Sequence, residues 1–253
     1  MNAIARYAHP SADYDQRLAH TQALLRQAAA DHPCAPDGTP RITLACSLGA
    51  EDLVLLHLIE TLNLPIDVFV LDTGALHDAT LALLAQLQQR LGARLRVLRP
   101  QPDAVTDFVA THGPKAMYQS IALRKACCQM RKLEPLARAL HGRSAWVTGL
   151  RREQSDARSD VPYVDTQDPT CTKYNPLAAW RWGDVWHYIG QNAIVYNPLH
   201  DQFYPSIGCA PCTRAISLGE PFRAGRWWWE DEAAKECGLH VAPVSALSDK
   251  VPA

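Results

Sequence analysis

Eight cysteines occur in the 253 residues, and four of them form two close pairs. Cys127 is followed directly by Cys128, and Cys209 and Cys212 enclose an Ala-Pro dipeptide. Four thiolates can hold an iron–sulfur cluster or a tetrahedral zinc ion. Adjacent cysteines are awkward ligands for one zinc ion, whose ligands are usually spaced by two to four residues. The spacing therefore favours an iron–sulfur cluster, with zinc and buried unliganded thiols as the alternatives.

Cys237 stands apart from the other cysteines, in a polar, glycine-containing segment near the C-terminus. A free thiol has a pKa of about 8.5 and needs nearby positive charge to be a thiolate at neutral pH. Lys235, His240, Arg223 and Arg226 can supply that charge. We therefore consider Cys237 a candidate nucleophile, and the alternative is a surface thiol with no role.

Two short motifs have the composition of an anion-binding site. Residues 46–52 read CSLGAED, in which small residues leave backbone N–H groups free at the start of a predicted helix. The segment is neither a Walker A nor a GxGxxG sequence, and its alternative interpretation is a tight turn capped by Ser47. Residues 71–74 read LDTG and follow the next predicted strand. Both motifs should then lie at the carboxyl edge of one sheet, where open α/β folds bind their ligands.

The pattern of apolar residues predicts the elements that position these motifs. Strands are expected over 41–46, 66–71, 94–98 and 145–148, and helices over 51–62, 78–91, 132–140 and 182–191. This succession predicts an α/β fold with a parallel sheet and flanking helices. We expect an N-terminal helical extension over 1–40 with a peripheral helix at 14–30. A nucleotide-binding α/β region should span 41–200, and 201–253 a loop-rich segment of the same domain.

Composition excludes several classes of protein. Hydrophobic residues make up 47% of the chain and the net charge is −1, so intrinsic disorder is excluded. The sequence pI of about 6.8 gives no basic field for a nucleic acid or an anionic membrane. There is neither an apolar run of membrane-spanning length nor an N-terminal signal peptide, which predicts a cytoplasmic protein with reduced thiols. A homo-oligomer is compatible with the sequence.

Taken together, the motifs resemble the cluster-bearing branch of the APS/PAPS reductase family, the assimilatory adenylylsulfate (APS) reductases. The resemblance runs from about residue 42 to residue 240. It rests on SLGAED (47–52), LDTG (71–74), CCQMRK (127–132), TGLRREQS (148–155), YPSIGCAPCTR (204–214), RAGRWWWE (223–230) and ECGLH (236–240).

The resemblance implies an adenine-nucleotide α-hydrolase-like (PP-loop) fold, a [4Fe-4S] cluster and a catalytic cysteine. The implied cluster ligands are Cys127, Cys128, Cys209 and Cys212. The implied catalytic group is Cys237, and the groups implied to surround the phosphosulfate are Lys132, Arg223, Arg226 and His240. The residues implied to bind the rest of the nucleotide are Ser47, Gly49, Ala50, Leu71, Asp72, Thr73, Gly149 and Arg158.

The implied reaction is thioredoxin-dependent reduction of APS to sulfite and AMP. The Cys237 thiolate would attack the sulfur and form an enzyme S-sulfocysteine, which a thioredoxin-type dithiol would then resolve. One alternative is a PAPS reductase, although members specific for PAPS lack the two cysteine pairs. A second is a PP-loop ATP-dependent ligase or thiolation enzyme, whose loop usually reads Ser-Gly-Gly-x-Asp-Ser; Leu48 disagrees with that pattern. A third is a non-enzymatic metal scaffold, in which Cys237 would have no purpose.

The remaining unusual residues have simpler interpretations. The three consecutive tryptophans at 227–229 are expected to divide between the core and the surface, and the less favoured alternative is a docking surface for the reductant. Trp180, Trp182 and Trp186 are expected in the core. For the Arg151-Arg152 pair, a substrate contact and a solvated pair are equally supported. The histidines expected to be capping or surface residues are His57, His77, His141, His187 and His200. The cysteines expected to be incidental or buried are Cys34, Cys46 and Cys171.

Overall fold

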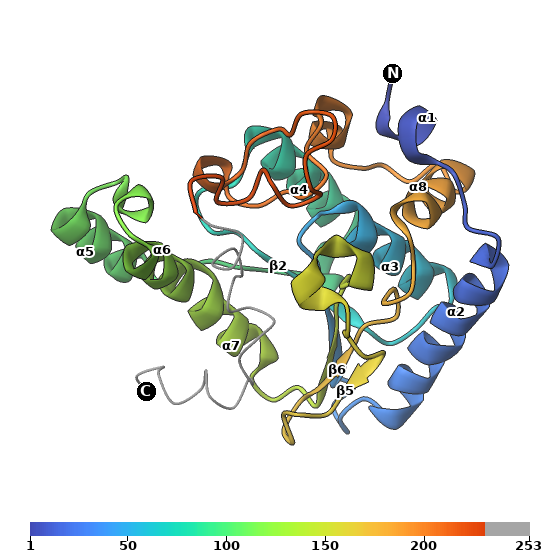
Figure 1. Ribbon diagram of the computed structural model, residues 1–253. Helices are drawn as coiled ribbons and strands as arrows, with labels where there is room; N and C mark the ends of the chain where they lie inside the picture. Colours follow the sequence, from blue (N-terminus) through green and yellow to red (C-terminus); the bar gives the residue numbers. More distant parts are fainter. Residues whose placement is uncertain (231–253) are drawn as a thin grey trace.

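A six-stranded sheet forms the centre of the computed structural model, which describes residues 1–230 (Figure 1). The strand order is β3-β2-β1-β4-β6-β5. The strands are β1 (Ile42–Ala45), β2 (Asp67–Leu71), β3 (Leu95–Leu98), β4 (Ala145–Val147), β5 (Val164–Asp165) and β6 (Thr172–Tyr174). Every pairing is parallel except that of β5 with β6. The expected parallel α/β sheet is confirmed, with a short antiparallel strand at one edge.

Helices cover both faces of the sheet. One face packs against α2 (Tyr14–Asp31), α3 (Ala50–Thr61), α4 (Asp78–Leu91) and α8 (Trp182–Gln191), and the other against α7 (Glu134–Leu140). β2 shows the alternation that this layering requires: Val68 and Val70 join the first core, whereas Phe69 joins the second. The sheet is therefore buried on both sides, as parallel sheets usually are.

The first cysteine pair forms the last two residues of α6 (Ile121–Cys128), and further helical turns follow it directly. α6 is capped by Ser120, whose hydroxyl accepts a hydrogen bond from the Leu123 N–H. It passes into a π-helical turn, η3 (Gln129–Leu133), and then into α7. Such turns are wider than an α-helical turn and occur often at functional sites. The predicted helix at 132–140 is thus the second half of a longer helical run, which α5 (Pro102–His112) precedes.

The N-terminal helix is not peripheral, which corrects the expectation for residues 14–30. In α2, Leu25 and Ala28 are fully buried in the main core. The Thr21 hydroxyl donates to the Pro176 carbonyl at 2.9 Å and accepts from the Trp180 indole at 2.8 Å. Small residues on this face let the helix pack closely, and such packing across the chain leaves little trace in local periodicity. The short helix α1 (Ala3–Tyr7) lies against α8.

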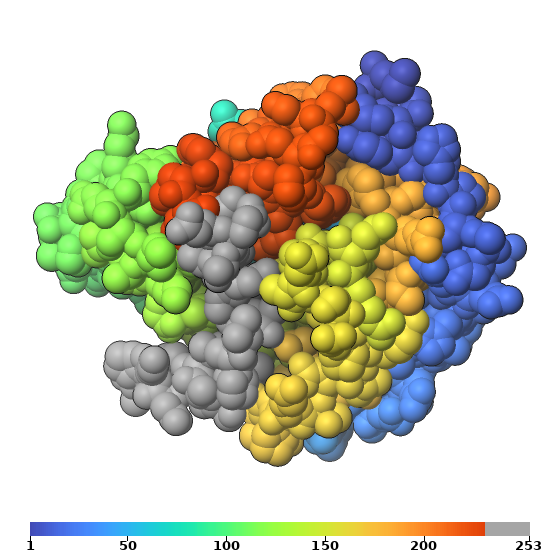
Figure 2. Space-filling model, viewed as in Figure 1, coloured from blue at the N-terminus to red at the C-terminus, as the bar shows by residue number. Residues whose placement is uncertain are grey.

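The C-terminal part of the described chain is loop-rich, as expected. After α8 it contains two short 3-10 helices, η6 (Pro198–Gln202) and η7 (Ala210–Cys212), and a β-bridge between Thr213 and Arg226. Figure 2 shows this segment, in orange and red, lying between the green surface of α5 and α6 and the blue N-terminal residues. Among residues 1–230 no helix has the length and apolar character needed to cross a bilayer.

Candidate active site

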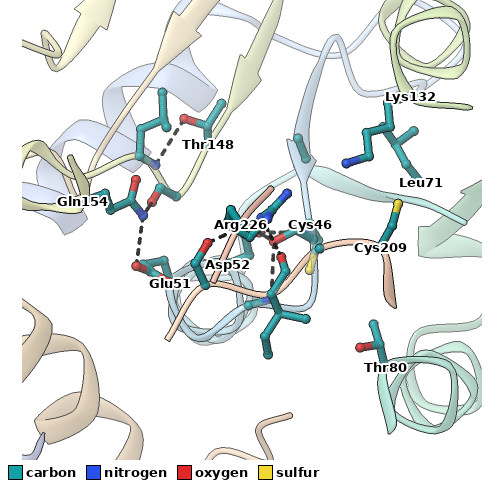
Figure 3. A pocket seen from close by; sticks show the side chains of 18 of the residues that line it. Cys46, Glu51, Asp52, Leu71, Thr80, Lys132, Thr148, Gln154, Cys209 and Arg226 are labelled. Carbon is teal, nitrogen blue, oxygen red and sulfur yellow. Dashed lines mark hydrogen bonds between the residues drawn. The ribbon is translucent and has the colours of Figure 1, made fainter. Parts of the chain in front are cut away.

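A cavity of about 210 Å³ opens at the carboxyl ends of β1, β2 and β4 (Figure 3). Segments far apart in the sequence form its walls, namely 45–52, 69–80, 132–136, 146–158 and 200–227. The two motifs predicted to meet at this edge of the sheet do so. This is also the edge at which open α/β folds bind ligands.

The turn after β1 is closed by a carboxylate from the helix that it precedes. Asp52 accepts hydrogen bonds from the Ser47 N–H at 2.7 Å and from the Ser47 hydroxyl at 2.5 Å. Leu48 adopts a left-handed conformation with φ of 65°. α3 begins at Ala50 with Gly49 as its N-cap residue and no side-chain cap, so Ser47 does not cap the helix. Burial raises the pKa of Asp52 to about 6.

The segment after β4 forms the opposite wall. A Cβ atom on Gly149 would lie 2.3 Å from the Asp52 Oδ1 atom, so only glycine fits at this approach. Arg151 is fully buried and donates to Glu51 at 3.0 Å and to Glu153 at 2.9 Å. The solvated interpretation of the arginine pair is therefore wrong for Arg151.

Four basic side chains line the cavity although each is at most 9% exposed. They are Lys132, Arg158, Arg223 and Arg226. Arg226 donates to the Ile207 carbonyl at 3.2 Å and lies 4.8 Å from the centre of the Trp227 ring, while its Nε has no hydrogen-bond partner within the described residues. A Cβ atom on Gly208 would lie 2.4 Å from the Arg226 guanidinium. Buried cations of this density suit an anionic ligand with several oxygens.

The four paired cysteines are buried together next to this cationic wall. Cys127, Cys128, Cys209 and Cys212 are each 6–8% exposed, form no disulfide, and share one apolar cluster. Burial raises the pKa of Cys127, and that of Cys212 to about 11. In residues 1–230 no three His, Cys, Asp or Glu side chains converge as metal ligands do. The four thiols are therefore neighbours within one apolar cluster of side chains.

The second cysteine loop is attached to the LDTG turn. The Thr73 hydroxyl lies 3.2 Å from the Cys209 sulfur, and the Ala210 N–H donates to the Ala75 carbonyl at 2.7 Å. Arg131, from the π-helical turn, donates to the Thr73 carbonyl at 2.7 Å. The LDTG turn (71–74), the first cysteine helix and the second cysteine loop thus contact one another.

The cavity gathers most of the residues that the sequence singled out. Those lining it are Ser47, Gly49, Leu71, Thr73, Lys132, Gly149, Arg158, Cys209, Arg223 and Arg226. Ala50 is buried at the start of α3, and Asp72 is engaged by Arg99 at 2.8 Å and by the Gly74 N–H. Cys237 and His240 lie outside the described residues.

His200 is a cavity residue that the sequence reasoning missed. The sequence predicts a capping or surface histidine here, but His200 is 2% exposed and lines the cavity. Its Nδ1 lies 2.8 Å from the Tyr204 carbonyl, which can only accept, so Nδ1 carries the proton. Burial lowers the pKa of His200 to about 4, which keeps it neutral at pH 7. Rings from Trp182 and Trp186 surround it, and these contacts are not readable from local sequence.

The parallel sheet with helices on both faces is an α/β fold of the adenine-nucleotide α-hydrolase-like (PP-loop) class. The crystal structure of FMN adenylyltransferase from Candida glabrata, in complex with FAD and inorganic pyrophosphate, superposes with a TM-score of 0.55. It covers 97% of this chain and 87% of its own at 13% identity. Such a likeness shows the fold alone.

Residues 41–215 match the phosphoadenosine phosphosulfate reductase domain, and the chain belongs to that family. An adenosine 5'-phosphosulfate reductase from Allochromatium vinosum is 52% identical over 200 residues, which cover 79% of this chain and 78% of the relative. One from Burkholderia cepacia is 49% identical, covering 82% and 83%. The PAPS reductase from Candida auris, solved as a phosphate complex, has a TM-score of 0.62 at 27% identity over 75% of this chain and 88% of its own. The resemblance inferred from the motifs is confirmed.

Proposed function

We propose that this protein reduces APS to sulfite and AMP in assimilatory sulfate reduction. The observation that carries the proposal is about 50% identity, over some four fifths of both chains, to relatives named adenosine 5'-phosphosulfate reductase. The cavity supports it, because a small compartment lined by four buried cations suits a nucleotide with a phosphosulfate end.

Each wall of the cavity has a proposed role in binding. Lys132, Arg223 and Arg226 hold the phosphosulfate, the arginines as planar forks and the lysine as a point charge. The nucleotide lies between the two motif turns, with Gly149 beside the adenine and Arg158 at the ribose or phosphate. Electrostatic stabilisation of the departing phosphate oxygens by these cations contributes on the order of a few kcal/mol in a closed site.

The proposed chemistry proceeds through Cys237. Its thiolate forms an S–S bond to the sulfur of APS while the S–O bond to phosphate breaks and AMP leaves. A thiol of a thioredoxin-type dithiol then attacks the Cys237 sulfur and displaces sulfite with the bonding pair. The second thiol of the dithiol releases Cys237, so the dithiol is oxidised to a disulfide as the sulfate group is reduced to sulfite. These reduced thiols suit a cytoplasmic location.

The four buried thiols fit a [4Fe-4S] cluster as the proposed cofactor. Thiolate sulfurs are the usual ligands of such clusters, and the four thiols lie in one apolar cluster of side chains. Arg131 and Lys132 lie in the π-helical turn that follows the first cysteine pair. When bound, such a cluster supplies a polarising charge beside the anion site. Iron with acid-labile sulfide in the anaerobically purified protein supports this proposal, whereas a colourless protein with one zinc ion contradicts it.

The test of the function is anaerobic sulfite release from APS and from PAPS, with thioredoxin present or omitted. We expect sulfite from APS only with the dithiol, and none from Cys237→Ser, which should still bind AMP. An S-sulfonated Cys237 should accumulate when the dithiol is omitted and be visible by mass spectrometry. Faster turnover of PAPS than of APS would favour the second candidate function, that of a PAPS reductase. The 27% identity to the Candida auris PAPS reductase supports this candidate. Pyrophosphate release from ATP would instead indicate a ligase.

A further inference from the structure

The side chain of Gln154 uses its full hydrogen-bonding capacity inside the wall of the cavity. Its Oε1 accepts from the Arg158 guanidinium at 2.6 Å and from the Arg151 backbone N–H at 3.2 Å. Its Nε2 donates to the Glu51 carboxylate at 3.0 Å and to the Gly149 carbonyl at 3.2 Å (Figure 3). Two acceptor bonds and two donor bonds are all that a glutamine amide can make.

These four partners fix the orientation of the amide. Guanidinium and backbone N–H groups can only donate, and carboxylate and carbonyl oxygens can only accept. Rotating the amide by 180° would set its NH₂ group against two donors and its oxygen against two acceptors. All four hydrogen bonds would be lost at once, so Gln154 has one usable orientation.

The groups that Gln154 joins belong to three walls of the cavity. Glu51 is in the first turn of α3, Gly149 follows β4, and Arg158 is in the 3-10 helix η5 (Asp156–Arg158). All three line the cavity, and Arg158 is only 8% exposed. Arg151 supports the arrangement from behind, because its Nε donates to the same Glu51 oxygen. A substitution of Gln154 therefore affects both the turn that precedes α3 and the Arg158 side chain.

We propose that Gln154 is a positioning residue for the nucleotide. It holds the Arg158 guanidinium and the Gly149 backbone at the places from which they contact the ribose or phosphate and the adenine. The inference rests on the proposed function for the identity of the nucleotide. Because Gln154 acts through Arg158 and Gly149, its loss should weaken binding more than it slows the chemical step.

The decisive variant is Gln154→Glu, which keeps the shape and the acceptor but replaces the NH₂ donor with an oxygen. That oxygen faces Glu51 and the Gly149 carbonyl, so the new pair of carboxyl groups should share a proton at low pH and repel at high pH. Within residues 1–230, the charged and titratable groups of the surrounding network include Glu51, Asp52, Arg151, Glu153, Arg158 and His200. We expect the KM for APS, and the dissociation constant of AMP, to rise about tenfold over wild type at pH 9 and to approach wild type at pH 6.

Two further variants complete the test. Gln154→Leu removes donor and acceptor together, so its loss of AMP affinity should be similar at every pH. Gln88→Glu makes the same charge change on an exposed residue of α4 and should behave as wild type. AMP binding near wild type in both Gln154 variants, or a defect of Gln154→Glu that does not depend on pH, would overturn the inference. AMP binding is measured without turnover, so a wild-type protein that binds AMP but releases no sulfite would contradict the proposed function and leave this test intact.

Discussion

Arg124 and Glu230 form a bidentate ion pair that is closed off from solvent. The Arg124 Nε and Nη2 atoms donate to the two Glu230 oxygens at 2.9 and 2.6 Å, and the two side chains are 1% and 2% exposed. The Arg124 guanidinium also lies 4.7 Å from the centre of the Trp227 ring. The pair joins the helix of the first cysteine pair to the last described residue, seven positions before Cys237.

Removing one partner of this pair should destabilise the protein strongly. Glu230→Gln removes the carboxylate that pairs with the buried Arg124 guanidinium, and breaking a buried ion pair typically costs about 3–5 kcal/mol of unfolding free energy. Glu60→Gln, which breaks the exposed pair with Arg90, should cost less than about 1 kcal/mol. Urea unfolding of both variants measures the difference. Equal small losses would show that the buried pair is dispensable.

Gly149→Ala should weaken nucleotide binding strongly. The added methyl group would lie 2.3 Å from the Asp52 carboxylate and 2.9 Å from the Glu51 Cβ. The segment after β4 must therefore move away from the first turn of α3. Gly49→Ala is a graded comparison, because its methyl group comes no closer than 3.3 Å to the Ser47 hydroxyl. We expect a loss of AMP affinity above about tenfold for the first variant and a smaller loss for the second. Isothermal titration with AMP checks the order, and the reverse order would contradict the geometry.

Asp52 should make stability fall as the pH rises from about 4 to about 6. Burial raises its pKa from 3.8 to about 6, so the folded protein binds this proton more tightly than the unfolded chain does. Ionisation of the buried carboxyl then costs up to about 3 kcal/mol across the window. Relative to wild type, Asp52→Asn should gain stability across this range, whereas Asp107→Asn, on the exposed side of α5, should not. Denaturant melts at pH 4, 5, 6 and 7 test this, and parallel curves for wild type and Asp52→Asn would refute it.

Replacing a clustered cysteine should lower the iron content of the protein, whereas replacing another buried cysteine should not. Cys127→Ser, Cys128→Ser and Cys212→Ser should each lower the iron and acid-labile sulfide of the purified protein by more than half, because each substitution removes a proposed thiolate ligand. Cys171→Ser is the matched control, since Cys171 is 3% exposed but packs in the second core beside Trp146. Iron content unchanged in all three cluster variants would contradict the assignment.

Local sequence predicted the layout of this protein better than its contacts. Strands 42–45, 67–71 and 95–98 follow their apolar runs, and both motif turns lie where parallel strands end. The short strands β5 and β6 were not predicted, because two or three residues are too few to show alternation. The tryptophan run splits as expected, with Trp227 fully buried and Trp228 39% exposed. The burial of His200 and Arg151 was not predicted, because their partners come from distant segments, which periodicity does not record.

The link between the LDTG turn and the second cysteine loop limits how the chain can be dissected. Thr73 and Ala75 contact residues more than 130 positions later in the sequence, and those residues form one wall of the ligand compartment. A recombinant fragment ending near residue 200 would keep every central strand yet expose apolar surface where that wall had been. The shortest fragment worth expressing for nucleotide-binding studies therefore extends through the tryptophan run, and proteolytic trimming within 205–227 should release bound nucleotide.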